Sequence, residues 1–227
     1  MTTEPSTAPP GPPVRLVTVS ATYGAGGSVV GPALAERLGL PFLQRVTTSE
    51  GHVTPPGPCD EQVSAEEVKA TPVHRLLASF TQAMPAGPTH SPPSTQHQDQ
   101  HLRGHGESGI HRLVASGGGV ILGRAAAVVL GKDCGYHVRL DGPPDRRVVQ
   151  GAAIEGIDDE EAQARLRVAD KARTAYVRRL YRVDPADATL YHLVIDSTAM
   201  PLDTVVELIL VAARAHSAAS QAATARS

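Results

Sequence analysis

The sequence predicts an α/β domain in which a doubly wound parallel sheet is covered by helices on both faces. Short apolar runs alternate with helix-compatible segments along the chain, and the runs do not show the polar and apolar alternation of a half-exposed strand. Strands of that kind are buried on both faces, which requires helices on either side of the sheet. The 227 residues suit one domain with appendages, because domains usually hold roughly 100 to 200 residues.

The first half of the predicted domain begins with a strand at residues 14–19, which leads into a glycine-rich turn. A helix follows, in which apolar residues recur every four positions from Val30 to Leu38, and Gly39 is placed to end it. Residues 40–43 are expected to form a second short strand. This strand, turn and helix succession is the start of a parallel α/β fold.

The middle of the chain changes in character. Residues 64–83 are compatible with a helix, whereas residues 85–106 are rich in Pro, Ser, Gln, His and Gly and predict a low-complexity insert without a packed core. Five histidines lie in or beside this insert, but their irregular spacing without cysteine does not predict a structural metal site, and a weak adventitious site stays open. They are His90, His97, His101, His105 and His111.

The second half of the chain repeats the alternation and completes a five-stranded sheet. Expected strands lie at 120–122, 136–140 and 193–195, and expected helices at 110–115, 125–130, 143–151 and 158–181. A final helix, capped by Ser197 or Thr198, carries an apolar stripe of Leu202, Val205, Val206, Ile209 and Ala213. This stripe can pack internally or against a second copy, so a homodimer is one expectation.

The composition argues against several kinds of partner. The formal net charge is −2, from 21 basic and 23 acidic residues, and aromatic residues are 3 % of the chain. We therefore expect no nucleic-acid binding, which needs a basic surface with stacking aromatic residues. No apolar run reaches the ~20 residues that cross a bilayer, and Cys59 and Cys134 lack the spacing of a zinc or disulfide framework. These features favour a cytoplasmic protein with no membrane association.

The glycine-rich turn is the strongest functional signal. Its residues align with the phosphate-loop pattern G-x-x-x-x-G-K-[ST], with Gly24, Gly26 and Ser28 in agreement. Glycines allow the tightly curved backbone that turns N–H groups inward around an anion, and the helix that follows adds the positive end of its dipole. We therefore expect a nucleotide phosphate to bind at the loop residues Tyr23, Gly24, Ala25, Gly26, Gly27 and Ser28.

Two positions of the loop depart from the pattern. Ala21 replaces the first glycine, and Gly27 replaces the lysine that would place a positive charge on the β- and γ-phosphates. Binding is therefore better supported than catalysis, and a plain glycine-rich turn is the alternative. Ser28 is expected to be a Mg²⁺ ligand through the bound nucleotide, or otherwise an ordinary helix N-cap. A Gly27→Lys variant is expected to tighten triphosphate binding.

Four blocks of sequence resemble the cytidylate-kinase-like family of P-loop nucleoside monophosphate kinase relatives. They are the loop at 23–27, the strand and Gly-Arg pair at 120–124, the strand at 136–140 followed by Arg146, and the Asp170-x-x-Arg173-x-x-Tyr176 run leading to residues 191–196. The resemblance covers most of residues 14–214, which we take as the domain, but not the insert. It leaves residues 1–13 and 215–227 as predicted disordered tails.

The resemblance implies roles for particular arginines. Arg124 would contact the acceptor nucleotide, and Arg167 and Arg173 would act as catalytic residues of a mobile helical lid at 158–182 that closes over the phosphates. The alternative for Arg173 is an intrahelical ion pair with Asp170, three positions before it. Ala125 stands where true CMP kinases carry an aspartate that helps hold the nucleotide, so cytidine specificity is not implied.

Two functions follow as hypotheses. The first is a kinase that uses ATP or another nucleoside triphosphate with Mg²⁺ and transfers a phosphoryl group to a nucleotide or related small acceptor. The second is a catalytically impaired pseudo-kinase or regulatory module that binds a nucleotide. Asp141, which ends the fourth predicted strand, could act as a carboxylate near the metal or simply begin the turn before Gly142.

Overall fold

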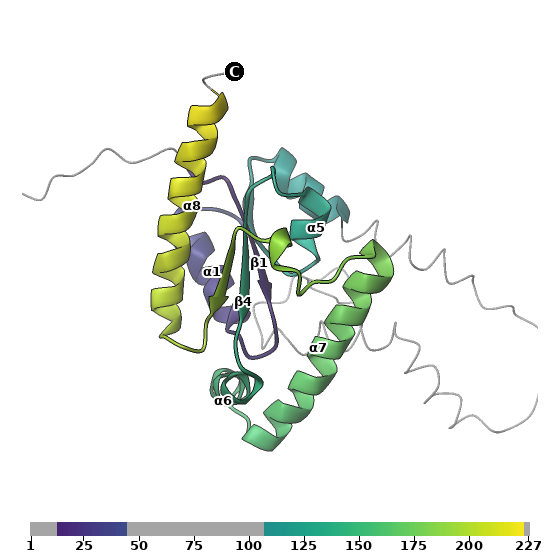
Figure 1. Ribbon diagram of the computed structural model, residues 1–227. Coiled ribbons are helices and arrows are strands. Elements are labelled where there is room, and N and C mark those ends of the chain that lie inside the picture. Colours follow the sequence, from purple (N-terminus) through teal and green to yellow (C-terminus); the bar gives the residue numbers. More distant parts are fainter. Residues whose placement is uncertain (1–12, 45–106, 225–227) are drawn as a thin grey trace, which may run out of the picture.

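The computed structural model describes residues 13–44 and 107–224, and they form a five-stranded sheet flanked by helices (Figure 1). All strand pairs are parallel, and the order across the sheet is β2-β3-β1-β4-β5. The strands are β1 (Leu16–Ala21), β2 (Phe42–Leu43), β3 (Gly119–Leu122), β4 (Tyr136–Asp141) and β5 (Leu193–Asp196). The predicted doubly wound, five-stranded parallel sheet is confirmed.

The helices lie on both faces of the sheet and beyond one of its edges (Figure 1). They are α1 (Gly27–Leu38), a helix at 107–115, α5 (Ala126–Leu130), α6 (Pro144–Glu155), α7 (Asp159–Tyr181), the short 3₁₀ helix η1 (Ala188–Leu190) and α8 (Leu202–Thr224). Helices α1 and α8 pack together against one face, whereas α5 covers β1 and β3 on the other. Helices α6 and α7 pack on each other at the carboxyl edge, where β1 and β4 end.

The main core lies between the sheet and the α1–α8 layer. Val17 and Val19 of β1 point into it, and they meet Leu34 of α1 and Ile209 of α8, all of which are fully or almost fully buried. The apolar stripe expected on the last helix is therefore used internally. Burial of a Val, Leu or Ile side chain contributes roughly 1.5 to 3 kcal/mol, so this layer holds α8 against the sheet.

The opposite face of β1 and β4 is polar, contrary to the expectation of uninterrupted apolar strands. Thr18 pairs in register with His137, and Ser20 with Arg139. Each side chain has a partner: the Thr18 hydroxyl bonds His137 Nδ1 at 2.7 Å, and the buried Arg139 guanidinium donates to Asp141 and to the Pro185 carbonyl. Residues on either side of η1 contact this polar face, since Arg139 donates to the Pro185 carbonyl and the Tyr191 hydroxyl donates to Ser20. The two strands are therefore covered on both faces, as the predicted fold requires.

Two predicted boundaries at the end of the chain were wrong. Helix α8 begins at Leu202 and not at a Ser197 or Thr198 cap, because the Ser197 hydroxyl donates to the Ala25 carbonyl at 2.8 Å and Thr198 donates to Asp196 at 2.6 Å. The helix also continues to Thr224, where a disordered tail was expected from residue 215. The segment is rich in alanine, the strongest helix former. The predicted helix at 64–83, the insert at 85–106 and residues 1–12 and 225–227 lie outside the described residues.

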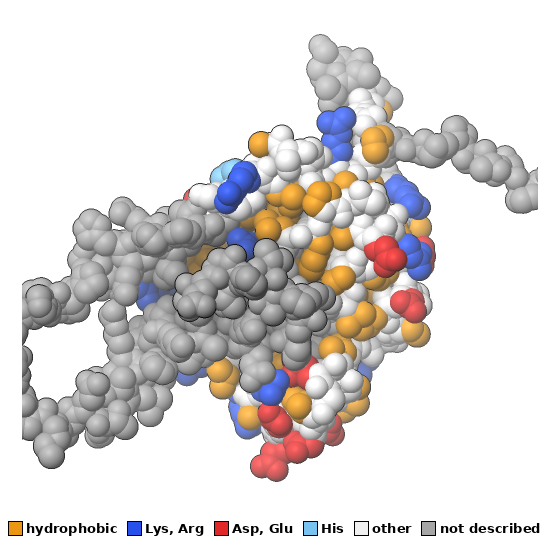
Figure 2. All heavy atoms as spheres, turned by 180° about the vertical axis from the view of Figure 1, so that it is seen from behind, with side chains coloured by type: hydrophobic (Ala, Val, Ile, Leu, Met, Phe, Trp, Pro, Cys, Tyr) orange, Lys and Arg blue, Asp and Glu red, His pale blue; other side chains and the backbone are white. Residues whose placement is uncertain are grey.

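Among the residues that the structure describes, no helix is long and apolar enough to cross a membrane. Seen from behind, hydrophobic side chains are spread over the middle of the visible face, and acidic and basic ones lie mostly toward its rim (Figure 2). On α8, Leu208 and Val211 lie outside the apolar stripe and are 45 % and 65 % exposed, whereas Val205, Val206, Ile209 and Ala213 of the stripe are buried. Association with a second copy stays a prediction.

A cluster of imidazole rings lies at the amino ends of β4 and β5, far from the glycine-rich loop. His192 stacks on both His137 and Tyr136, and His216 of α8 lies 4.6 Å from His192, centroid to centroid. Burial lowers the pKa of His137 and of His192, and the neighbouring charges of His216 and Lys132 lower both further. The folded state therefore favours neutral imidazoles here.

Unfolding free energy is expected to fall as the pH drops below about 6.5, the ordinary histidine value. Below about pH 6.5 the unfolded chain binds protons at His137 and His192, whereas the folded protein, in which both pKa values are lowered, does not. The stability that these residues contribute at higher pH is therefore lost as the pH falls. Replacing His192→Asn keeps an acceptor for the His137 amide and removes one titrating group, so urea unfolding at pH 7 and pH 5.5 should differ less than in the wild type. His111→Gln, at an exposed position on the helix at 107–115, is the control; equal pH dependence in all three proteins would contradict the assignment.

Candidate phosphate-binding site

The glycine-rich loop leaves β1 at the carboxyl edge of the sheet and enters α1. Gly24 and Gly26 both have left-handed backbones, with φ of 71° and 77°, a region that L side chains rarely adopt. A Cβ added at Gly24 would lie 2.0 Å from the carbonyl oxygen of Arg147. The glycines are thus required by close approach and by backbone conformation, as the phosphate-loop pattern predicts.

The loop presents a set of backbone amides at the start of α1. The Ala25 amide donates to Thr22 O inside the loop, and the Tyr23 amide donates to Asp170. The amides of Gly24, Gly26, Gly27 and Ser28 have no hydrogen-bond partner among the described residues. Successive unsatisfied N–H groups beside a helix N-terminus are the arrangement that binds phosphate in proteins.

The hydroxyl of Ser28 does not cap the helix. The N-cap is Gly26, with no side-chain hydrogen bond, and Ser28 is the second residue of α1. No hydrogen bond from its hydroxyl to another described residue is formed, so the N-cap alternative was wrong. The hydroxyl remains available as an oxygen ligand beside the amides.

Ala21 and Gly27 are coupled by packing. A Cβ built at Gly27 would lie 2.6 Å from Ala21 Cβ and 3.1 Å from Leu122 Cδ1. The methyl group at the first loop position thus occupies the space where a side chain at position 27 would begin. A single Gly27→Lys change would overpack this site, so the expected gain in binding from that variant alone is not supported by the structure.

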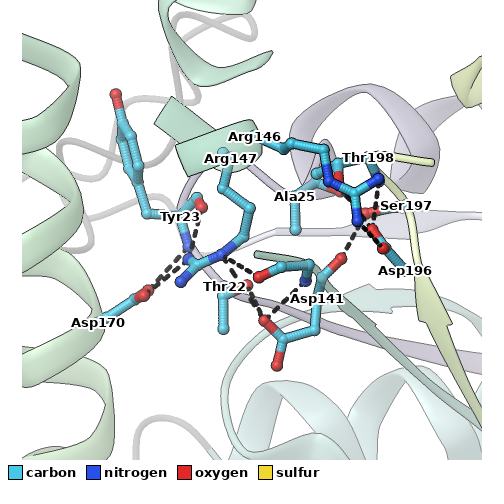
Figure 3. Close-up of polar contacts among 12 residues, drawn as sticks. Thr22, Tyr23, Ala25, Asp141, Arg146, Arg147, Asp170, Asp196, Ser197 and Thr198 are labelled. Atoms are coloured by element: carbon cyan, nitrogen blue, oxygen red, sulfur yellow. Dashed lines mark hydrogen bonds and ion pairs between the residues drawn. The ribbon is translucent and has the colours of Figure 1, made fainter. Parts of the chain in front are cut away.

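Side chains from α6 and α7 hold the loop from outside (Figure 3). Arg147 donates from Nη1 to Tyr23 O at 2.9 Å and to Asp170 Oδ2 at 2.7 Å, and from Nε to Gly142 O at 2.9 Å. Gln150 donates to Gly24 O at 2.9 Å. Two loop carbonyls and one loop amide are therefore fixed by the helix pair.

The Tyr23 side chain anchors the loop to the same helices. Its ring is 2 % exposed and packs with alanines of α6 and α7, and its hydroxyl donates to Glu155 Oε2 at 3.0 Å. Glu155 also accepts from Arg165 at 2.7 Å. A Cβ at Gly151 would come within 2.9 Å of the ring, so α6 is shaped to receive it.

Asp141 supports the loop and begins the turn after β4. Its Oδ1 accepts from Thr22 Oγ1 and from the Gly142 amide, and its Oδ2 accepts from Arg139. Burial would raise the pKa of Asp141, but the hydrogen bonds and charge of Arg139 outweigh it and lower the pKa. Both oxygens are engaged, which confirms that the residue starts the turn and does not favour a role as a metal carboxylate.

The two arginines expected in the lid lie on α7, three positions either side of Asp170. Arg167 is exposed and Arg173 is half-buried, and neither forms a hydrogen bond with another described residue. Asp170 pairs with Arg147, so the intrahelical ion pair with Arg173 that served as the alternative is not formed. Since Asp170 touches the loop, both arginines are within one helical turn of the residue that contacts it.

Arg124 lies at the end of β3, the strand beside β1 on the side away from β4. It has φ of 58° and donates to Gln44 O at 3.3 Å. Ala125 also has a positive φ, of 52°. The structure places Arg124 at the carboxyl edge of the sheet, and its assignment to the acceptor stays a prediction.

Over residues 13–44 and 107–224, no group of three or more His, Cys, Asp or Glu side chains could hold a metal ion. Four of the five histidines considered from the sequence, His90 to His105, lie outside the described residues.

The model of the cytidylate kinase-like family matches residues 16–199. The chain belongs to the cytidylate kinase-like family. The match spans the loop, the whole parallel sheet and α7, in agreement with the sequence blocks that carry the resemblance. The parallel order β2-β3-β1-β4-β5 with a glycine-rich loop after β1 is the P-loop kinase fold of this family.

Two curated relatives match parts of the chain. A cytidylate kinase from Methanopyrus kandleri is 34 % identical over 111 residues, which is 44 % of this chain and 58 % of that protein. A uronate isomerase from Corynebacterium glutamicum is 31 % identical over 96 residues, 42 % of this chain and 18 % of that protein. The chain thus spans 58 % or less of the length of these relatives.

The fold is also seen in a solved structure. An uncharacterized protein from Eubacterium ventriosum superimposes with a TM-score of 0.57 at 17 % identity, covering 86 % of this chain and 95 % of that one. At this identity the likeness concerns the fold alone.

Sequence reasoning missed the residues that clamp the loop. Arg147, Gln150 and Glu155 come from α6, about 125 residues after the loop, and no short motif joins them to it. Asp170 was noted as part of the Asp170-x-x-Arg173-x-x-Tyr176 run and as a helical neighbour of Arg173, but not as a contact of the loop. The one available signal was the charged pair Arg146 and Arg147 in the first turn of a helix that follows a strand.

Proposed function

We propose that this kinase-like protein binds a nucleoside triphosphate, such as ATP, together with Mg²⁺ at the loop 21–28, and transfers its terminal phosphoryl group to a nucleotide or related small acceptor. The observation that carries the proposal is the row of amides at Gly24, Gly26, Gly27 and Ser28 that have no hydrogen-bond partner in the part of the chain that the structure describes. Open amides at Gly26, Gly27 and Ser28 occur at the start of any helix. This turn differs in that the Gly24 amide, ahead of the helix, also lacks a partner among the described residues, and in that Gly24 and Gly26 both have left-handed backbones. The family match supports the same reading.

The loop residues fit the proposed ligand. The left-handed backbones of Gly24 and Gly26 give the loop the curvature that turns amides inward around an anion. The Ser28 hydroxyl supplies an oxygen of the kind Mg²⁺ prefers. The metal ion would neutralise charge on the β- and γ-phosphates. Since Asp141 is engaged by Arg139 and Thr22, the protein would contribute few ligands, which is usual for Mg²⁺ bound through a nucleotide.

The loop amides would hold the phosphates, and Arg167 and Arg173 would supply the positive charge that the absent lysine cannot. Guanidinium groups bind phosphate oxygens in pairs and stabilise the charge that spreads over the phosphoryl group during transfer. Arg167 is exposed and Arg173 is half-buried, and both guanidinium groups lack a hydrogen-bond partner among the described residues, which leaves them able to bind phosphate. Arg124, at the end of β3, would hold the acceptor.

A second candidate function is a nucleotide-binding module without transferase activity. The observation that favours it is the Ala21 methyl group, which fills the space where a side chain at position 27 would begin. The loop therefore lacks the usual lysine and also lacks room for one. Such a module would still bind a triphosphate, so binding alone does not separate the two candidates. We place either form in the cytoplasm, acting on nucleotides and not on nucleic acid, in keeping with its charge balance.

Transfer is tested by incubating the protein with ATP, Mg²⁺ and a panel of nucleoside monophosphates and small phosphate acceptors, followed by product analysis. Arg173→Ala is expected to lower the rate by tenfold or more, about the effect of losing a charge that stabilises the transferring group, while unfolding free energy changes by less than ~1 kcal/mol.

Arg214→Ala, at an exposed position of α8, is the matched control and should behave as the wild type. If the wild type binds ATP but forms no product with any acceptor, the second candidate replaces the first. If Arg173→Ala unfolds easily with its transfer rate unchanged, the arginine is structural.

A further inference from the structure

The phosphate loop carries an anion of its own. Asp170 of α7 accepts a hydrogen bond from the Tyr23 amide at 2.9 Å through Oδ1, and its Oδ2 accepts from Arg147 at 2.7 Å (Figure 3). Tyr23 is the third residue of the loop, directly before the amides of Gly24 and Gly26. A carboxylate thus lies where the amides and a guanidinium together attract negative charge.

The two members of this ion pair are held very differently. The Arg147 side chain is 7 % exposed and has two further hydrogen bonds, to Gly142 O and Tyr23 O, which fix it beside the loop. The Asp170 side chain is 25 % exposed and has only its contacts with Arg147 and the Tyr23 amide among the described residues. Asp170 is therefore the member that can leave, and Arg147 the member that stays.

We propose that the Asp170 carboxylate is an internal substitute for a phosphate group, which an incoming triphosphate displaces to reach the Tyr23 amide and to take Arg147 as its counter-ion. This inference rests on the proposed function. It assigns a positive charge to the loop in addition to the lid arginines, from α6 and not from the loop itself. It also means that the ligand must break one contact between α7 and the loop, while the packing of the Tyr23 ring on α7 can remain.

The chemistry favours displacement by a triphosphate over a monophosphate. An anion that shares the site with Asp170 is repelled by its charge, whereas one that replaces it gains the Tyr23 amide and an arginine that is already fixed in place. In a triphosphate, one phosphate group can accept hydrogen bonds from the amides of Gly26 to Ser28 while another displaces Asp170. A monophosphate can bind either those amides or the Tyr23 amide and Arg147, but not both.

Two measurements test the displacement. In the first, amide hydrogen exchange of the loop peptide is followed without nucleotide in the wild type, in Asp170→Ala, and in Glu160→Gln, an exposed acidic residue in the first turn of α7 with no partner among the described residues. Exchange at residue 23 is expected to be about tenfold faster in Asp170→Ala alone. Unchanged exchange would overturn the proposal, because the carboxylate would then not hold the loop.

In the second, ATP with Mg²⁺ is titrated into the wild type, Asp170→Asn, Glu160→Gln and the double variant Asp170→Asn/Arg147→Gln. Asp170→Asn removes the competing charge and should bind about tenfold tighter. The double variant removes the cation as well, without leaving a buried charge unpaired, and should lose that gain. Glu160→Gln should match the wild type.

The outcomes separate this proposal from the proposed function. If the wild type binds ATP and Asp170→Asn binds it equally or more weakly, Asp170 is a support for the loop and only the displacement is wrong. If the double variant binds as tightly as Asp170→Asn, Arg147 is not the counter-ion. If no variant binds ATP although all are folded, the proposed function and the displacement fail together.

Discussion

Gly24→Val is expected to abolish triphosphate binding and to lower the unfolding free energy by roughly 2 to 5 kcal/mol. The added Cβ would lie 2.0 Å from the Arg147 carbonyl oxygen, which belongs to the backbone of α6 and cannot rotate away. The backbone at φ of 71° is also strained for a branched residue. Either α6 or the loop must move, and both carry the contacts that shape the site. Chemical unfolding and ATP titration of the same preparation measure the two effects.

Gly39→Ala is the control for this prediction. Gly39 ends α1 with φ of 63°, but a Cβ there would meet nothing within 4 Å. The Gly39→Ala substitution therefore adds the strain of a left-handed backbone, about 1 kcal/mol, but no steric clash and no change in the loop. If Gly24→Val is too unstable to assay, Gly26→Ala is the milder test, since its Cβ would meet only the Leu202 side chain, at 2.6 Å. A folded Gly24→Val protein that binds ATP like Gly39→Ala would contradict the role of the loop.

The double variant Ala21→Gly/Gly27→Lys is expected to bind ATP at least tenfold more tightly than the wild type, a gain of about 1.4 kcal/mol from the restored ammonium. Removing the Ala21 methyl opens the space that a Cβ at position 27 needs, now blocked at 2.6 Å. Gly27→Lys alone should lose roughly 1 to 3 kcal/mol of stability through overpacking, with little gain in affinity. Thermal unfolding and calorimetric titration of the two single variants and the double variant give the comparison.

The double variant tests whether positions 21 and 27 are coupled. Ala21→Gly alone should leave the affinity for ATP almost unchanged, so the affinity gained by the double variant should exceed the sum of the gains of the two single variants. An equal gain from Gly27→Lys with and without Ala21→Gly would show that the methyl group does not control the site. No gain in the double variant, with its fold intact, would show that the loop does not present position 27 to a phosphate.

The sheet was predictable because each strand can be recognised from a short run of neighbouring residues. The run from Gly119 to Leu122 is apolar throughout and is buried on both faces, as a central parallel strand should be. Strands β1 and β4 were expected to be apolar on both faces, but Thr18 and Arg139 lie on a polar face, where side chains of the two paired strands bond to each other and to neighbouring segments. The apolar residues on the other face of each strand were enough to identify both strands from the sequence.

The site was predictable only as far as the loop itself. Gly24, Gly26 and Ser28 are recognisable from spacing, because the backbone geometry they permit is set within a few residues. The clamp from Arg147 and Asp170 joins positions 124 and 147 residues from Tyr23, which no periodicity or short motif encodes. The conflict between Ala21 and Gly27 likewise depends on a distance between side-chain positions that only the folded loop reveals.

The most direct test of the account is a calorimetric titration of the wild type with ATP, with and without Mg²⁺, and with a nucleoside monophosphate as the comparison ligand. The account predicts saturable ATP binding to one site that Mg²⁺ strengthens, weaker binding of the monophosphate, and retention of ATP binding in Gly39→Ala. Folded wild-type protein that shows no heat of ATP binding at about millimolar concentration, with or without Mg²⁺, would contradict it. The glycine-rich segment would then be only a tight turn between β1 and α1.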